Sequence, residues 1–185
     1  KIKNMETEIP NWYLWNPGIK QNVCNDIIDI VDKWTPAGII EKGDYELDKS
    51  IRDSSVFFVD RRTHKWVYDL TWEFVNLANM KSRWHYNITE QQNIQLTRYE
   101  TGNYYGVHRD DGLVVDGMAR KLSMTILLND DFNGGDFEIL GSEMQPELKQ
   151  GSVLCFPSYS FHKVNEVING TRYSLVSWFI GTPFR

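Results

Sequence analysis

The spacing of hydrophobic positions divides the chain into a helical first part and a strand-rich second part. In the first part, two stretches place apolar residues every three or four positions, which is typical of helices with one buried face. The first helix follows Asn16-Pro17, since proline suits a first turn, and should end before Pro36. The second is predicted over residues 63–80. Both stripes are expected to pack in the core; their members are Ile19, Val23, Ile27, Ile28, Val31 and Trp34, then Trp66, Val67, Leu70, Phe74, Leu77 and Ala78.

Strands are indicated by short runs of β-branched and aromatic residues bounded by turn residues. Two of these runs, 39–40 and 55–59, lie between the predicted helices. The connectors 133–136 and Asn169-Gly170 are of the kind that joins hairpins. Helices followed by many short strands predict a mainly β, α+β fold, a sandwich or barrel braced by helices. The later strands are predicted over 94–99, 122–128, 136–140, 152–156, 162–167 and 172–180.

Composition narrows the class of protein. The 185 residues fit one domain, and a hydrophobic share of 41% with 14% aromatics is too high for a disordered chain. The net charge of −5 argues against a general binder of nucleic-acid backbones. No apolar run approaches the roughly 18–20 residues of a membrane helix, and no apolar signal region is evident, so a cytoplasmic protein is expected. Cys24 and Cys155 are expected to be reduced core thiols.

His108, Asp110 and His162 form the clearest chemical pattern. On an extended segment, residues two apart point to the same face, so His108 and Asp110 can converge on one point. A histidine from another strand would complete a set of two imidazoles and one carboxylate with open positions, the arrangement of non-haem Fe(II) oxygenases. His-x-Asp alone is a weak motif. The other two histidines, His64 and His85, lie in the helical part, where structural roles suffice.

Arg172 and Ser174 share one face of the last predicted strand. Arginine is a fixed cation whose planar fork suits a carboxylate, and a cation on an inward face needs an anion to compensate it. A dicarboxylic co-substrate that chelates the metal at one end and pairs with Arg172 at the other would supply that anion, with the Ser174 hydroxyl as a further donor. A buried structural salt bridge is the alternative for Arg172.

The joint spacing of these residues with several others resembles the prolyl 4-hydroxylase type of iron/2-oxoglutarate dioxygenase. The resemblance covers roughly residues 90–181, and the earlier part is more loosely similar to the helical brace of that family. The residues that carry it are Tyr99-x-x-Gly102-x-x-Tyr105-x-x-His108-x-Asp110, Asn133-x-Gly135, Gly151-Ser152, Phe156-Pro157-Ser158, His162-x-Val164 and Gly170-x-Arg172.

The resemblance implies a double-stranded β-helix (a cupin-like jelly roll) in a single domain over residues 1–185. Residues 1–90 would form the helical brace and outer strands, and residues 91–181 the catalytic core. The implied cofactors are Fe(II), 2-oxoglutarate and dioxygen, with ascorbate as reductant. The implied activity is hydroxylation of an unactivated C–H bond with release of succinate and CO2. His108, Asp110 and His162 would bind iron, and Tyr99 would join Arg172 and Ser174 at 2-oxoglutarate.

The same resemblance implies a substrate side. Tyr105 would line the site of a peptidyl proline, and Trp178 would lie beside iron and substrate. Arg52 and Ser54 resemble an Arg-x-Ser pair that algal and collagen-type members use near the peptide, and Arg120 stands where another substrate-side arginine occurs. A proline-containing peptide or protein is therefore the expected partner, with no nucleic acid and no membrane. A lysyl residue, a free amino acid or another small molecule is the alternative substrate.

Two further alternatives remain open. Nucleic-acid demethylases of this fold carry a second arginine six residues after the basic anchor, where this chain has Trp178, and the acidic charge is also unfavourable. A metal-free jelly-roll binding module would be expected to lack at least one ligand or the anchor, and this chain lacks none of them. Collagen-type enzymes use lysine as the anchor, so Arg172 fits the bacterial, viral and hypoxia-sensing branches better.

The connector Asn169-Gly170 raises a question of register. A two-residue hairpin there would turn Arg172 away from the face of His162, because side chains alternate along a strand. If both residues face the pocket, the loop must have an odd number of residues or a β-bulge must lie between them. Either way, Arg172, Ser174, Val176 and Trp178 are expected to point inward, and Tyr173, Leu175 and Ser177 the other way.

Overall fold

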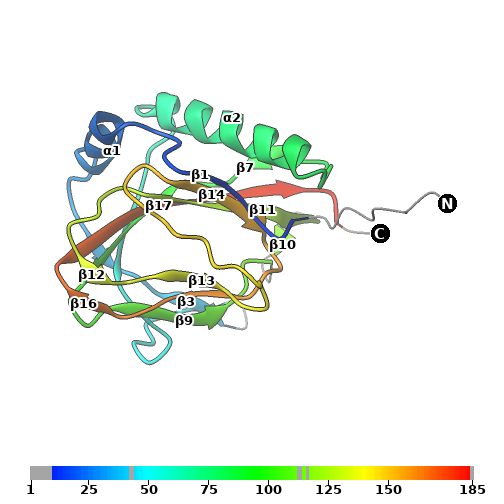
Figure 1. Ribbon diagram of the computed structural model, residues 1–185. Coiled ribbons are helices and arrows are strands. Elements are labelled where there is room, and N and C mark those ends of the chain that lie inside the picture. Colours follow the sequence, from blue (N-terminus) through cyan, green and yellow to red (C-terminus); the bar gives the residue numbers. More distant parts are fainter. Residues whose placement is uncertain (1–9, 42–43, 112–113, 116, 184–185) are drawn as a thin grey trace.

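Two antiparallel sheets face each other and form most of the molecule (Figure 1). The computed structural model describes residues 10–41, 44–111, 114–115 and 117–183. The larger sheet has the strand order β1-β14-β11-β17-β8-β6-β2, with β10 beside β11 and β7 beside β17. Its strands are β1 (Tyr13–Trp15), β2 (Thr35–Pro36), β6 (Ser55–Phe58), β7 (Glu90–Gln91), β8 (Gln95–Glu100), β10 (Val114–Val115), β11 (Met118–Leu127), β14 (Val153–Pro157) and β17 (Thr171–Gly181).

The smaller sheet has the order β13-β15-β9-β5, and two short pairs, β12–β16 and β3–β4, lie outside both sheets. This arrangement confirms the predicted mainly β fold with a helical brace. The remaining strands are β3 (Ile39–Glu41), β4 (Asp44–Glu46), β5 (Arg52–Asp53), β9 (Tyr104–His108), β12 (Asn133–Gly134), β13 (Phe137–Ile139), β15 (His162–Val164) and β16 (Val167–Asn169).

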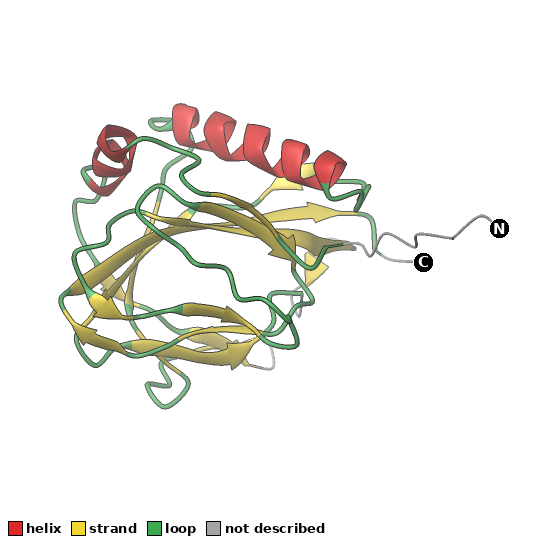
Figure 2. Ribbon diagram, in the orientation of Figure 1, coloured by secondary structure: helices red, strands yellow, loops and turns green. Residues whose placement is uncertain are grey.

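Both helices, α1 (Gln21–Ile28) and α2 (Lys65–Lys81), cover the outer face of the larger sheet (Figure 2). The predicted first helix was too long, because the backbone N–H groups of Gly18 and Ile19 donate to the Gly151 carbonyl before the helix begins. Beyond Ile28 the chain leaves the helix, so Val31 and Trp34 pack against the core from a loop.

The buried face of α2 differs from the predicted stripe. Trp66 and Leu77 are 42% and 40% exposed, so these two assignments were wrong. The buried side of the helix is instead centred on Thr71, whose hydroxyl donates within the helix and accepts a hydrogen bond from Gln91 of β7. Because the residue at the centre of this buried face is polar, the hydrophobic pattern of the sequence did not indicate which side of the helix is buried. The buried residues of α2 are Val67, Tyr68, Thr71, Val75 and Ala78.

Strand β17 divides its side chains between two environments, as predicted. The inward set lines the cavity between the sheets. On the other face, Leu175 and Tyr173 pack in the core under the helices, and Ser177 accepts a hydrogen bond from Gln91. The inward residues are Arg172, Ser174, Val176 and Trp178.

The predicted hairpin between His162 and Arg172 was wrong. His162 lies on β15, which pairs with β9 and β13 in the smaller sheet, whereas Arg172 lies on β17 in the larger sheet. Gly170, at φ +88°, takes the chain from β16 into β17, and a Cβ there would approach the Asp131 carbonyl oxygen to 2.9 Å. The two residues face the cavity from opposite sheets, so the parity of a single hairpin does not govern them.

Strand β11 contains an irregularity that matters for the site. Arg120 pairs with Ile180, and Leu122 pairs with Phe179, so one extra residue of β11 lies between these pairs. A bulge of this kind reverses the alternation of side chains. The side chains of Arg120 and Ser123 consequently both point toward the cavity side of the sheet. In a regular strand, residues three apart would point to opposite faces.

Among the described residues, neither helix combines the length and apolarity needed to cross a membrane. Cys24 and Cys155 are both buried and unpaired, as expected.

Candidate active site

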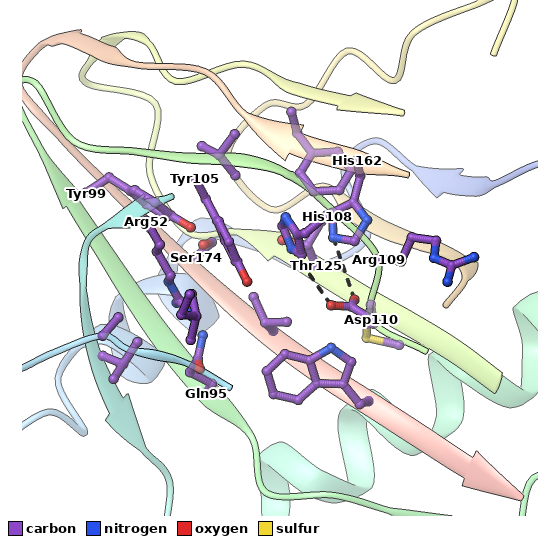
Figure 3. A pocket seen from close by; sticks show the side chains of 18 of the residues that line it. Arg52, Gln95, Tyr99, Tyr105, His108, Arg109, Asp110, Thr125, His162 and Ser174 are labelled. Carbon is purple, nitrogen blue, oxygen red and sulfur yellow. Dashed lines mark ion pairs between the residues drawn. The ribbon is translucent and has the colours of Figure 1, made fainter. Parts of the chain in front are cut away.

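A cavity of about 490 Å³ lies between the two sheets and receives side chains from both. Figure 3 shows His108, Asp110 and His162 gathered at one side of it, with Arg52 and Tyr99 on the other and Tyr105 between them. The smaller sheet contributes the two histidines, and the larger sheet contributes the opposite wall.

The structure brings His108, Asp110 and His162 into one cluster whose ligand atoms all lie within 4.8 Å of one another. His108 on β9 and His162 on β15 are directly opposite each other in an antiparallel pair, which places both rings on the same face of the smaller sheet. Asp110 follows β9 directly, with its carboxylate oxygens 3.9 Å from Nε2 of His108 and 3.6 Å from Nε2 of His162. In the described part of the chain this is the one such group.

Hydrogen bonds at Nδ1 orient both imidazole rings so that Nε2 of each ring faces Asp110. Nδ1 of His108 lies 2.8 Å from the Gly106 carbonyl oxygen, and Nδ1 of His162 lies 2.9 Å from that of Ser160. A carbonyl only accepts, so each Nδ1 donates a hydrogen bond, and each Nε2 faces Asp110. Burial, followed by the neighbouring His162, lowers the pKa of His108 to about 4, which leaves its ring neutral. This is the state in which histidine binds a metal.

Ser123 holds the carboxylate. Its hydroxyl donates to Oδ2 of Asp110 at 2.6 Å and lies 3.0 Å from the hydroxyl of Ser158, while the Asp110 backbone N–H donates to the Ser158 carbonyl. Burial would raise the pKa of Asp110, but the two imidazoles and the Ser123 hydrogen bond outweigh it and hold that pKa below its ordinary value. Ser123 was not among the residues predicted for the site, although a serine in the mainly apolar run 122–128 was a signal.

Arg172 is buried, with 1% of its surface exposed, and it forms no ion pair with a described residue. One terminal nitrogen donates to the Ser174 hydroxyl at 3.0 Å, and its Nε has no hydrogen-bond partner in the described structure. Burial lowers the pKa of this guanidinium from its ordinary value. The alternative of a structural salt bridge therefore finds no support. A buried cation with unused donors fits an anionic ligand that enters the cavity.

Tyr99 and Gly135 enclose Arg172. Tyr99 on β8 pairs with Arg172 in the larger sheet, and its ring centroid lies 5.6 Å from the guanidinium carbon. Gly135, at φ +65°, passes so close that a Cβ there would lie 3.0 Å from Cδ of Arg172. The structure thus brings Tyr99, Arg172 and Ser174 together at one end of the cavity.

Tyr105 connects the metal cluster to Arg52. Its ring stacks on His108 with the centroids 3.6 Å apart and the planes 13° from parallel. Arg52 lies on β5, the strand next to β9, and its guanidinium carbon is 4.6 Å from the centroid of the Tyr105 ring. The Arg52 Nε donates to the Ser54 hydroxyl at 2.9 Å. Burial raises the pKa of Tyr105 to about 12, so its hydroxyl stays protonated.

Arg120 and Trp178 form a second cation–π contact, 4.2 Å from guanidinium carbon to ring centroid. Arg120 also donates to Gln92 Oε1 at 2.6 Å and to the main-chain oxygen of Asp110 at 3.2 Å. Four of the residues predicted for the substrate side line the cavity: Arg52, Tyr105, Arg120 and Trp178. The fifth, Ser54, does not line it but accepts a hydrogen bond from Arg52. The hydrogen bond between Arg120 and Gln92 was not predicted from the sequence.

The donor set fits Fe(II) and 2-oxoglutarate. Two imidazoles and one carboxylate on one side of a cavity suit Fe(II) and leave positions open. The unpartnered Nε of the buried Arg172 suits the far carboxylate of a dicarboxylic acid, for which arginine offers a bidentate fork. The residues that would hold iron are His108, Asp110 and His162.

Comparison with known proteins agrees with this site. Residues 94–180 match the model of the 2OG-Fe(II) oxygenase superfamily. A PKHD-type hydroxylase of Idiomarina loihiensis is 37% identical over 89 residues, which are 46% of this chain and 40% of that protein. A PKHD-type hydroxylase of Picosynechococcus is 41% identical over 87 residues, 45% of this chain and 39% of that protein. The chain therefore matches only about two fifths of the length of these curated relatives.

Solved structures show the same fold. A viral collagen prolyl hydroxylase from Paramecium bursaria Chlorella virus-1 superposes with a TM-score of 0.70 at 14% identity, covering 94% of this chain and 97% of that one. A Pseudomonas putida prolyl-4-hydroxylase gives 0.69 at 19% identity, covering 91% and 92%. The predicted double-stranded β-helix is thereby confirmed. The sequence match over residues 94–180 and the His–Asp–His cluster thus make this segment similar to the 2OG-Fe(II) oxygenase superfamily.

Proposed function

We propose that the chain is an Fe(II)- and 2-oxoglutarate-dependent hydroxylase whose substrate is a peptidyl proline. The observation that carries the proposal is the pairing of two sites across one cavity. The His108–Asp110–His162 cluster lies on one side, and the buried Arg172, whose Nε has no hydrogen-bond partner among the described residues, lies on the other. A metal ligand set and a carboxylate receptor in the same cavity suit a chelating dicarboxylic co-substrate.

The proposed reaction consumes R–H, dioxygen and 2-oxoglutarate and yields R–OH, succinate and CO2. The C–H bond and the oxidative decarboxylation each supply two electrons, and dioxygen accepts all four. Bound Fe(II) would supply the activation of dioxygen, which protein side chains alone do not provide. The chain's own residues would bind, orient and exclude water, and no protein general base is required.

Individual residues have distinct proposed tasks. Arg172, with Tyr99 and Ser174, would bind the carboxylate of 2-oxoglutarate that is remote from the metal. Ser123 would keep the Asp110 carboxylate oriented, and the carbonyls that accept from Nδ1 would keep both Nε2 atoms aimed at the metal. Tyr105 and Trp178 would form walls for the substrate.

The prolyl substrate is supported by observations separate from those that support the class of reaction. Supporting it are the aromatic walls beside the cluster, the Arg52–Ser54 hydrogen bond and the fold shared with prolyl hydroxylases. A lysyl residue, a free amino acid or a small molecule is the competing substrate. Ascorbate is proposed only as the reductant of the assay.

Mass spectrometry tests both levels of the proposal. Proline-containing and lysine-containing peptides are incubated with the protein, Fe(II), ascorbate and 2-oxoglutarate, and succinate is measured in parallel. The proposal expects a product heavier by one oxygen atom, with the oxygen on proline, and no product from the Asp110→Ala variant. Oxygen on lysine would overturn the prolyl assignment, and absence of succinate under all conditions would overturn the enzyme class.

A further inference from the structure

The charged lining of the cavity is unbalanced. Among described residues it includes four arginines, but Asp110 is its one carboxylate. Arg109 is compensated by Asp111, with Nε 3.3 Å from Oδ1. In the proposed function, Arg172 is compensated by 2-oxoglutarate, and Asp110 is used by the metal. The two remaining arginines are Arg52 and Arg120.

Neither Arg52 nor Arg120 forms an ion pair with a described residue. Arg52 is 7% exposed, and its one hydrogen bond is the donation from Nε to the Ser54 hydroxyl. Arg120 donates only to neutral oxygens, those of Gln92 and of the Asp110 main chain. Since a guanidinium carries five N–H donors, both side chains retain donors that these neutral acceptors do not use. Arg52 is buried and Arg120 is half-buried, and cations that are withdrawn from water in this way are expected to meet an anion.

Tyr105 places these cations beside the reacting centre. Arg52 lies over one face of the Tyr105 ring, and His108 stacks on that ring in turn. Figure 3 shows Arg52 and Tyr105 side by side, with the Tyr105 hydroxyl directed into the cavity and the metal cluster beyond the ring. Arg120 approaches the same cluster from the larger sheet, through its hydrogen bond to Asp110. A ligand held by the two guanidinium groups would therefore lie next to the metal cluster.

We propose that the substrate of this site carries a carboxylate, which Arg52 and Arg120 bind together while the oxidised C–H bond faces the metal cluster. This inference rests on the proposed function and narrows its substrate class. The carboxylate has two chemical sources: a glutamyl or aspartyl side chain beside the oxidised residue, or the α-carboxylate of a free amino acid or chain end. Both present the same planar anion to an arginine fork.

Binding to matched ligand pairs tests the inference without turnover. The protein is loaded with Fe(II) and saturating 2-oxoglutarate in the absence of dioxygen and titrated calorimetrically. One pair is L-proline and L-prolinamide, and the other is acetyl-Pro-Glu-amide and acetyl-Pro-Gln-amide. The acid of one pair should bind about tenfold or more tightly than its amide, because hydrogen bonds to a charged group are the stronger ones. The pair that shows the preference identifies the source.

Variants then assign the preference to Arg52. In Arg52→Gln the acid and the amide should bind about equally. Arg52→Lys should retain part of the preference for the acid, since the charge stays and the bidentate fork is lost. Arg62→Gln removes a charge that is paired with Asp60 at the surface and should leave the preference intact. Arg52 is chosen over Arg120 because Arg120 also holds the main chain of Asp110.

The outcomes separate this inference from the proposed function. Equal or tighter binding of both amides, no binding by any ligand, or an unchanged preference in Arg52→Gln would overturn the carboxylate site. Dioxygen is then admitted to the same samples. Succinate with hydroxylated amides as abundant as hydroxylated acids would leave the function standing and the inference refuted. Acid-selective binding without succinate would refute the function and leave only the carboxylate-binding site standing.

Discussion

The Ser123 hydroxyl donates a 2.6 Å hydrogen bond to Oδ2 of Asp110 and so connects the larger sheet to the carboxylate of the metal cluster. The cluster draws its two histidines from the smaller sheet. Its geometry therefore depends on the contact between the sheets, and this hydrogen bond holds the Asp110 carboxylate in its orientation.

Replacing Ser123 by alanine should weaken metal binding about 10- to 100-fold, because outer hydrogen bonds orient the ligands that touch the metal. Titration with Co(II) followed by absorbance measures this directly. Ser152→Ala is the matched control, since it also removes a buried hydroxyl, one bonded to Asn16 and to the Lys149 backbone away from the cluster. Equal metal affinity in Ser123→Ala and Ser152→Ala would contradict the assigned role.

Removing the Arg172 side chain should weaken 2-oxoglutarate binding strongly. Breaking a buried charge pair costs about 3–5 kcal/mol, which corresponds to about 10²- to 4 × 10³-fold in affinity. Arg172→Ala should show this loss, and Arg172→Lys a smaller one because the bidentate fork is absent. The comparison ligand is 2-oxobutyrate, which lacks the second carboxylate. The effect of Arg172→Ala should largely disappear with it, and an undiminished effect would place the carboxylate elsewhere.

Gly135→Ala should perturb Arg172. A Cβ at this position would lie 3.0 Å from both Cδ of Arg172 and Cγ2 of Val167, on a backbone with φ +65°. The left-handed conformation alone costs about 1–2 kcal/mol of stability. Gly141→Ala is the control, since Gly141 has φ +78° and nothing within 4 Å of a Cβ. Both variants should lose stability in thermal unfolding, but only Gly135→Ala should also lose 2-oxoglutarate affinity.

Tyr105 should serve the metal and the substrate through different parts of its side chain. The ring stacks on His108, and an aromatic pair contributes about 0.5–1.5 kcal/mol. Tyr105→Phe keeps the ring and should retain Co(II) affinity while losing substrate-stimulated succinate formation. Tyr105→Ala should lose about 2- to 10-fold in Co(II) affinity as well. If Tyr105→Ala bound Co(II) as tightly as Tyr105→Phe, the stacking would have no role in holding His108.

The sequence could predict what depends on local alternation. Side chains two apart share a face of a strand, so the convergence of His108 with Asp110 and the shared face of Arg172 and Trp178 followed from position alone. The helical brace and most strands followed from hydrophobic period and turn residues.

Features that depend on contacts between distant strands were not predictable in this way. The sequence places His162 ten residues before Arg172, and nothing local shows that β15 joins the smaller sheet while β17 joins the larger. The bulge in β11 reverses the face of Arg120 relative to Ser123 and has no turn residue to mark it. The buried side of α2 was obscured for a similar reason, because Thr71 finds its partner in Gln91 of another element.

Succinate formation is the most direct measurement of the central claim, that the His108–Asp110–His162 cluster and Arg172 form one Fe(II)/2-oxoglutarate site. The wild-type protein is supplied with Fe(II), 2-oxoglutarate and dioxygen, beside His108→Ala, Asp110→Ala and His162→Ala variants whose folding is checked by circular dichroism. The claim predicts succinate and CO2 in equal amounts from the wild type and none above background from the three folded variants. Near-native turnover in any of these variants, or no succinate from the wild type, would contradict it.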